Sequence, residues 1–179
     1  MTDSLLSTSH RLQVMGGPAT ITVQHSPDQT ALARSACDRA EGTLRTLETR
    51  YSRYRPDSLI SQINGRAGSD TWTPLDDEAL ALFRFCHTLW TQTAGLFDPT
   101  AGILRRVWDF KTGRPGNPEQ IPELLQRVGW SMVSLEEHKV RLEKPDMELD
   151  LGGVVKEYAA DKVAQQLREQ GLDCALIEL

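Results

Sequence analysis

The segment from Asp150 to Lys156 places an acid, two glycines and a lysine between a predicted strand and a predicted helix. Gly152 and Gly153 would let backbone N–H groups approach an anion at the N-terminus of the helix, which suits a phosphate. Lys156, about one turn into the helix, adds a positive charge, and Asp150 can accept a hydrogen bond from a hydroxyl or an amide. The segment matches neither the P-loop nor the dinucleotide-binding fingerprint, so an ordinary strand-to-helix turn remains the alternative.

A second segment, Leu96-Phe97-Asp98-Pro99, follows a predicted helix. Because the residue before a proline favours an extended backbone, the carboxylate of Asp98 is expected to project. An aromatic ring beside an acid can grip a planar group such as adenine or isoalloxazine. In the alternative interpretation, Phe97 packs into the core and Asp98 caps the next turn.

A third segment, residues 51–64, mixes aromatic, arginine and hydroxyl side chains just past a predicted helix. Tyr54 can stack on a ring, and Arg53 and Arg55 can contact a phosphate. A solvated basic turn, in which Ser58 caps a short helix, is the alternative.

The histidines and cysteines predict no metal or nucleophile site. The four histidines lack ligand spacing, and the three cysteines are far apart with no CxxC pair, so neither zinc nor a disulfide framework is indicated. No Ser-His-Asp or Cys-His set can be proposed, so no catalytic residue is assigned.

The elements that must position these segments begin with two strands, Arg11 to Met15 and Ala19 to Val23, joined through residues 16–18. Two long helices are predicted from Pro27 to Tyr51 and from about Asp77 to Thr93. Each should bury one apolar face. The stripe positions of the first are Ala33, Ala36, Ala40, Leu44, Leu47 and Tyr51, and those of the second are Leu82, Phe83, Cys86, Leu89 and Trp90.

The second half predicts a surface loop over residues 111–122 and a short helix to Val128, because glycine and proline are dense there. Three short strands, 131–135, 140–143 and 147–151, should form an antiparallel meander. A third long helix with a buried stripe (Val155, Ala159, Val163 and Leu167) should end at Gly171 and lead into a buried strand over 174–179. The fold class is therefore α+β, an antiparallel sheet with packed helices.

Composition favours one globular domain. The chain has 179 residues, 39% of them hydrophobic, and a formal charge of -5, which does not favour nucleic acid as a partner. The first ten residues contain no apolar run, so we expect no signal peptide, no membrane span and a cytoplasmic location. Residues 1–9 are expected to form a polar extension, and residues 10–179 the domain.

Taken together and in this order, four blocks resemble the FAD:protein FMN transferase (ApbE-type) family, formerly described as thiamine-biosynthesis lipoproteins. The blocks are Val14-Met15-Gly16-Gly17, Tyr51 to Asn64 (SRYxxxSxIxxIN), Leu96 to Thr100 with Trp108 following, and Asp150 to Asp161 (DLGGxxKxYAAD). The resemblance covers nearly the whole chain and implies an ApbE-like, T-fold-like architecture.

The resemblance implies an enzyme that binds FAD and a divalent metal, usually magnesium, and moves FMN onto a threonine or serine hydroxyl of an acceptor protein, releasing AMP. It implies a backbone-carbonyl metal ligand at Gly153. The implied FAD contacts are Met15, Tyr54, Leu96, Phe97, Asp98, Asp150 and Lys156.

The sequence departs from the family pattern in several places. Glu157 stands where the family commonly has glycine, Gly17 where it usually has threonine, and no lipobox cysteine precedes Met15. The family continues after the last predicted strand with a glycine-rich turn and a half that carries the main aspartate and threonine metal ligands. We therefore expect a domain truncated at its C-terminus, and the alternative function is a non-catalytic flavin-binding or interaction module.

Overall fold

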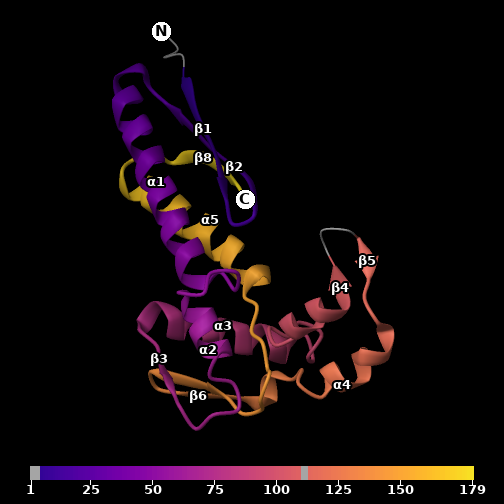
Figure 1. Cartoon of the computed structure of the whole chain (residues 1–179). Helices are drawn as coiled ribbons and strands as arrows, with labels where there is room; N and C mark the ends of the chain where they lie inside the picture. Colours follow the sequence, from indigo (N-terminus) through magenta and orange to yellow (C-terminus); the bar gives the residue numbers. More distant parts are fainter. Residues whose placement is uncertain (1–4, 110–112) are drawn as a thin grey trace. The chain divides into compact units, whose positions relative to one another are not determined.

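The computed structural model describes residues 5–109 and 113–179. By their contacts these residues divide into two compact units, one built from residues 5–51 together with Gly152–Leu179 and the other from Ser52–Leu151 (Figure 1). The two ends of the chain thus fold together, and the intervening hundred residues form a unit of their own. The single domain expected over residues 10–179 stays a prediction.

A three-stranded antiparallel sheet in the order β1-β2-β8 forms the first unit, from β1 (Leu6–Val14), β2 (Gly17–His25) and β8 (Cys174–Glu178). Met15 and Gly16 make the turn between β1 and β2 with φ values of 52° and 82°. Two left-handed residues in succession match the twist of a two-residue hairpin. The hairpin was predicted, but its strands are longer and its turn lies earlier than expected, and residues 6–9 belong to β1 rather than to an extension.

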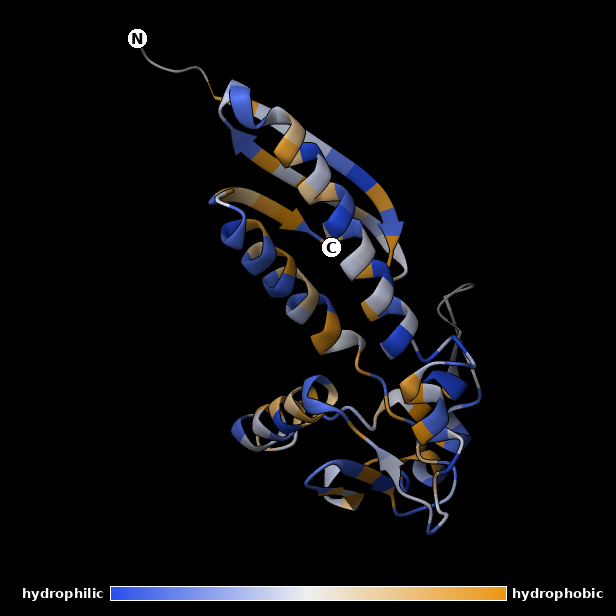
Figure 2. Cartoon of the chain, turned by 90° about the vertical axis from the view of Figure 1, so that its left-hand side faces the viewer, coloured by the Kyte–Doolittle hydropathy of each residue, from blue (hydrophilic) through white to orange (hydrophobic). Residues whose placement is uncertain are grey.

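Two helices, α1 (Thr30–Tyr51) and α5 (Gly152–Glu169), pack beside each other and against this sheet. A short 3-10 turn, η1 (Pro27–Gln29), precedes α1. The predicted apolar stripes of both helices are buried, and in Figure 2 hydrophobic residues recur along one side of each helix. The 3.6-residue period therefore identified both packing faces correctly.

The prediction that the strand near the C-terminus is buried was wrong. β8 pairs with β2, but Cys174, Ala175 and Leu176 are exposed. Within the described residues β8 is the last strand of its sheet and pairs with β2.

The second unit contains α2 (Leu59–Asn64) and α3 (Asp77–Gln92), whose first turns are capped by the side chains of Ser58 and Asp76. A small antiparallel sheet has the order β3-β7-β6. The other elements of the unit are β3 (Thr73–Pro74), η2 (Gly102–Val107), β4 (Trp108–Asp109), β5 (Arg114–Pro115), η3 (Pro118–Gln120), α4 (Ile121–Leu125), η4 (Trp130–Met132), β6 (Val133–Glu136) and β7 (Lys139–Leu142).

Two predictions in this unit need correction. α4 begins before Pro122, so the predicted loop ends earlier than expected. A proline fits the first turn of a helix because the backbone N–H groups there have no partner within the helix. Residues 111 and 112 of the predicted loop lie outside the described ranges. Residues 147–151 do not form a strand of the sheet, although Glu148 makes an isolated parallel bridge to Ala101. The hydrogen bonds that replace strand pairing there belong to the candidate site.

The structure confirms the α+β class, with antiparallel sheets and packed helices. Among the described residues, no helix has the length and apolarity that a membrane span requires.

Candidate functional site

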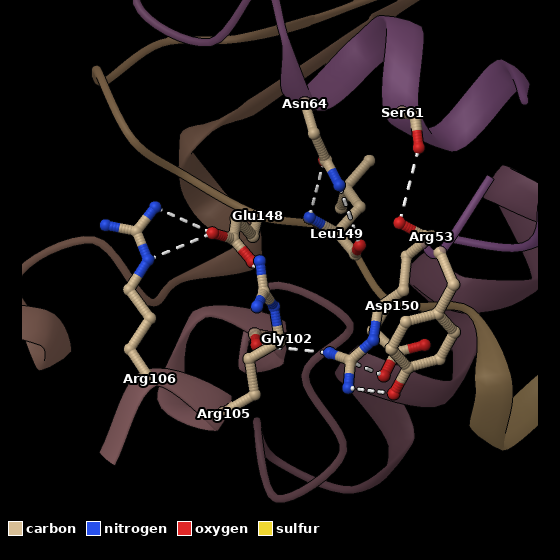
Figure 3. A network of polar contacts seen from close by, with 10 residues as sticks. Arg53, Ser61, Asn64, Gly102, Arg105, Arg106, Glu148, Leu149 and Asp150 are labelled. Carbon is tan, nitrogen blue, oxygen red and sulfur yellow. Dashed lines mark hydrogen bonds and ion pairs between the residues drawn. The ribbon is translucent and has the colours of Figure 1, made fainter. Parts of the chain in front are cut away.

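An extended segment, Glu148-Leu149-Asp150, forms the centre of the site (Figure 3). The side-chain amide of Asn64, at the end of α2, pairs with both polar groups of the Leu149 backbone. Leu149 N–H donates to Asn64 Oδ1 at 2.7 Å, and Asn64 Nδ2 donates to the Leu149 carbonyl at 3.1 Å. The amide thus satisfies the backbone groups that a neighbouring strand would otherwise bond. This explains why residues 147–151, which alternate apolar and polar side chains as a strand does, do not join the sheet.

Asp150 is fixed both through its backbone and through its side chain. Its N–H donates to the carbonyl of Pro99 at 2.8 Å. Its Oδ2 lies 3.0 Å from Nη1 of Arg53, whose side chain is only 11% exposed, whereas that of Asp150 is 35% exposed. Asp150 is therefore an oriented carboxylate that a ligand can still reach.

The guanidinium of Arg53 connects several parts of the site. Nη1 also donates to the carbonyl of Gly102 at 3.2 Å, and Nη2 donates to the hydroxyl of Tyr54 at 2.9 Å (Figure 3). The guanidinium carbon lies 4.9 Å from the centre of the Tyr54 ring, a cation-π distance, yet the tyrosine is 77% exposed. Arg53 thus holds an exposed aromatic ring and a carboxylate together.

Asp98, by contrast, organises its own loop. Its Oδ1 accepts from Thr100 N–H at 2.8 Å and from the Thr100 hydroxyl at 2.6 Å, and its Oδ2 accepts from Trp130 N–H at 2.9 Å. Asp98 therefore caps the turn that follows it, as the alternative interpretation expected. Phe97 is half-buried and Leu96 is 92% exposed, so Leu96 is the more accessible of these two neighbours.

Three predicted segments, separated in the sequence, thus meet in the second unit. The bond from Asp150 to Pro99 joins the acid to the Leu96–Pro99 segment, and Arg53 joins it to Tyr54. This agrees with the proximity that one shared ligand requires. The assignment of Tyr54, Leu96, Phe97, Asp98 and Asp150 as FAD contacts stays a prediction.

The remaining predicted contacts lie in the first unit. Met15 occupies the hairpin turn, where its N–H donates to Oε1 of Glu48 at 2.5 Å. Gly152 and Gly153 form the first turn of α5 and are exposed, and Lys156 is half-buried one turn later. The two glycines therefore begin the helix itself, as an anion site at a helix N-terminus requires.

Sequence reasoning assigned no role to a pair of arginines beside the extended segment. Nε of Arg105 lies 2.9 Å from Oε2 of Glu148, and Nη2 of Arg106 lies 2.7 Å from Oε1. These three side chains, with Arg53 and Asn64, help to line a cavity of about 350 Å³. A buried glutamate between two arginines has no local sequence signal, because the partners lie more than 40 residues apart.

Acidic, histidine and cysteine side chains of the described residues do not gather into a group of three that could hold a metal ion. Gly153 could offer a backbone carbonyl, which is one oxygen of the near-octahedral set that magnesium needs. Magnesium in proteins commonly keeps several waters and binds one or two carboxylates together with substrate phosphates, so the ligand at Gly153 stays a prediction. Burial raises the pKa of the Cys86 thiol to about 12, so this cysteine is a packing residue rather than a thiolate ligand.

Comparison with known proteins identifies the family of this chain. A sequence model of the ApbE family matches residues 15–179, which is most of the chain and includes both units. The chain belongs to the ApbE family.

Relatives within the ApbE family carry the name of an enzyme. The FAD:protein FMN transferase of Treponema pallidum is 29% identical over 164 residues, covering 87% of this chain and 45% of that protein. The enzyme of the same name from Chlamydia muridarum is 34% identical over 119 residues, covering 62% of this chain and 36% of that protein. The chain thus spans less than half the length of these curated relatives.

Solved ApbE structures support the fold. The flavin transferase ApbE from Vibrio cholerae has a TM-score of 0.88 at 22% identity, over 98% of this chain and 58% of that one. The ApbE protein of Thermotoga maritima has a TM-score of 0.85 at 24% identity. At these identities the likeness establishes the ApbE architecture and not the roles of individual residues.

Proposed function

We propose that this chain is part of an FAD:protein FMN transferase. The reaction moves FMN from FAD to a threonine or serine hydroxyl of an acceptor protein and releases AMP. The observation that carries the proposal is that three separate sequence blocks meet at Asp150, whose carboxylate pairs with Arg53, the residue that also holds Tyr54, and whose N–H donates to Pro99. A ring platform and an accessible carboxylate at one place suit a ligand with planar rings and hydrogen-bond donors.

In the proposed reaction the acceptor oxygen attacks the phosphorus of the FMN half of the pyrophosphate. The bond from that phosphorus to the bridging oxygen breaks, AMP leaves with the bridging oxygen, and the hydroxyl proton is lost. Tyr54 and Asp150 would bind and orient FAD in this scheme, and Lys156 stays an FAD contact implied by the family resemblance. We assign no catalytic base.

Magnesium belongs to the proposal because the relatives' family implies it. When bound, the ion would neutralise charge on the phosphate oxygens. The described residues contribute the carbonyl of Gly153 at most, and we derive no step through the metal.

The test uses protein expressed from the complete gene, incubated with FAD, magnesium and a peptide that carries an acceptor threonine. Mass spectrometry should find a peptide with FMN added, and the same peptide with alanine in place of threonine should remain unmodified. FAD binding without transfer to any acceptor would instead favour the non-catalytic flavin-binding module. Failure to bind FAD would refute both functions.

A further inference from the structure

We propose that Arg53 is a positioning residue of this site: its guanidinium sets the ring of Tyr54 and the carboxylate of Asp150 in their binding geometry before the ligand arrives. The inference rests on the proposed FAD site and adds a residue that is not among the FAD contacts implied by the family resemblance. Arg53 is argued to act through the two side chains that it holds.

The first support is the contrast in burial between Arg53 and Tyr54. An aromatic side chain that is 77% exposed would ordinarily sample several rotamers in water. Here a hydrogen bond to the Tyr54 hydroxyl and a cation-π contact tie the ring to a guanidinium that is mostly buried. The ring therefore presents a fixed, accessible surface.

The second support is the planar fork of the guanidinium. Nη2 holds the Tyr54 hydroxyl, while Nη1 holds both the Asp150 carboxylate and the Gly102 carbonyl. These bonds place the two prospective ligand contacts at a set separation. A lysine offers a single point charge and cannot serve both partners with the same geometry.

The third support is a buried donor of Arg53 that is not satisfied. Nε of Arg53 is buried and has no hydrogen-bond partner among the described residues. An unsatisfied buried N–H is unfavourable for stability, and such groups in native structures call for an explanation. A positioning role explains the unsatisfied Nε, because the bonds of the two Nη atoms fix the place of the guanidinium.

Ordering two side chains in advance lowers the entropy lost when a ligand binds. Arg53→Gln should therefore weaken FAD binding by about tenfold or more. Arg53→Lys can keep only the ion pair, so its FAD affinity should lie between those of the wild-type protein and Arg53→Gln. Tyr54→Phe keeps the ring but loses the bond to Nη2, so we expect a weakening of several fold. Arg84→Gln is the matched control, since Arg84 is an exposed arginine on α3 of the same unit.

The experiment measures the FAD dissociation constant, the fluorescence anisotropy of bound flavin and the melting temperature of each variant, expressed from the complete gene. Weaker binding and more mobile flavin in folded Arg53→Gln, with Arg84→Gln unchanged, are the expected results. Wild-type affinity in folded Arg53→Gln, even with a lowered melting temperature, would show that Arg53 is only structural.

If Arg53→Gln does not fold, the pair Arg53→Lys and Tyr54→Phe decides. Tyr54 is exposed, so its hydroxyl can be removed without disturbing a core. Wild-type FAD affinity in both variants would overturn the proposal, whereas weaker binding in both supports it. A wild-type protein that does not bind FAD would refute the proposed function itself, which separates that failure from failure of the positioning role.

Discussion

Replacement of Asn64 by alanine should be among the most destabilising changes available in the second unit. The Asn64 side chain satisfies both polar groups of the Leu149 backbone, and Leu149 is fully buried. Without the amide, one N–H and one C=O lose their partners. A buried unsatisfied group costs about 1–3 kcal/mol, so the free energy of unfolding should fall by about 2–4 kcal/mol, allowing for some access of water from the adjoining cavity.

Tryptophan fluorescence makes this loss measurable in the relevant unit. The chain has four tryptophans, Trp72, Trp90, Trp108 and Trp130, and all of them lie between Ser52 and Leu151. Urea unfolding followed by their emission therefore reports on the unit that contains Asn64. Small domains are stable by about 5–15 kcal/mol in total, so the expected shift in the transition is large.

Gln62→Ala provides the matched control, because Gln62 lies on the same helix, is exposed and bonds only to the exposed Asp57 carbonyl. It should change the free energy of unfolding by about 0.5 kcal/mol or less. Equal unfolding free energies for Asn64→Ala and Gln62→Ala would refute the view that this amide stands in for a strand.

Three further changes have expected outcomes. Asp98→Ala should lower the free energy of unfolding by about 2–4 kcal/mol, since Trp130 N–H and a buried threonine lose their acceptor; urea denaturation tests it. Gly102→Ala should lower it by about 1–3 kcal/mol, because the added Cβ would lie 3.0 Å from the extended segment; the same titration tests it. Iodoacetamide at pH 8 should modify exposed Cys174 in the native protein but spare buried Cys86, whose pKa of about 12 keeps the thiol protonated; peptide mass spectrometry tests it.

Each of these outcomes has a control in the same chain. Asp77→Ala removes an acid that is almost wholly exposed and should leave the unfolding free energy nearly unchanged. Gly42→Ala adds a methyl group in open space on α1 and should be neutral or stabilising. Labelling of Cys86 should appear once urea unfolds the protein; equally fast labelling of Cys86 and Cys174 in the native state would contradict the burial argument.

The long helices could be predicted from sequence because their information is local. The stripes of α1 and α5 repeat every three or four residues, and each stripe is buried as expected. The cap at Ser58 could also be predicted, since a capping side chain bonds to a backbone group three residues away. Where both partners of an interaction lie within one turn, the sequence is sufficient.

The extended segment could not be predicted in this way. Met147, Leu149 and Leu151 alternate with polar residues as in a strand, and all three are buried, but the partner of Leu149 is a side chain 85 positions earlier. The role of Arg53 could not be predicted for the same reason, since in the sequence it is only one of several residues in a basic turn. Its carboxylate partner lies almost 100 residues further along the chain.

The two acids predicted from the sequence as FAD contacts, Asp98 and Asp150, differ in the groups that hold their carboxylates. Oδ1 of Asp98 accepts hydrogen bonds from the N–H and hydroxyl of Thr100, and Oδ2 accepts one from Trp130 N–H, so these bonds hold the carboxylate in place. A carboxylate oxygen can accept more than one hydrogen bond, so this arrangement does not prevent a ligand from binding Asp98. Oδ2 of Asp150 pairs with the guanidinium of Arg53, and the Asp150 side chain is 35% exposed. Asp150 thus links the extended segment to Arg53, and Asp98 links its turn to Trp130, while contact of either carboxylate with FAD stays a prediction.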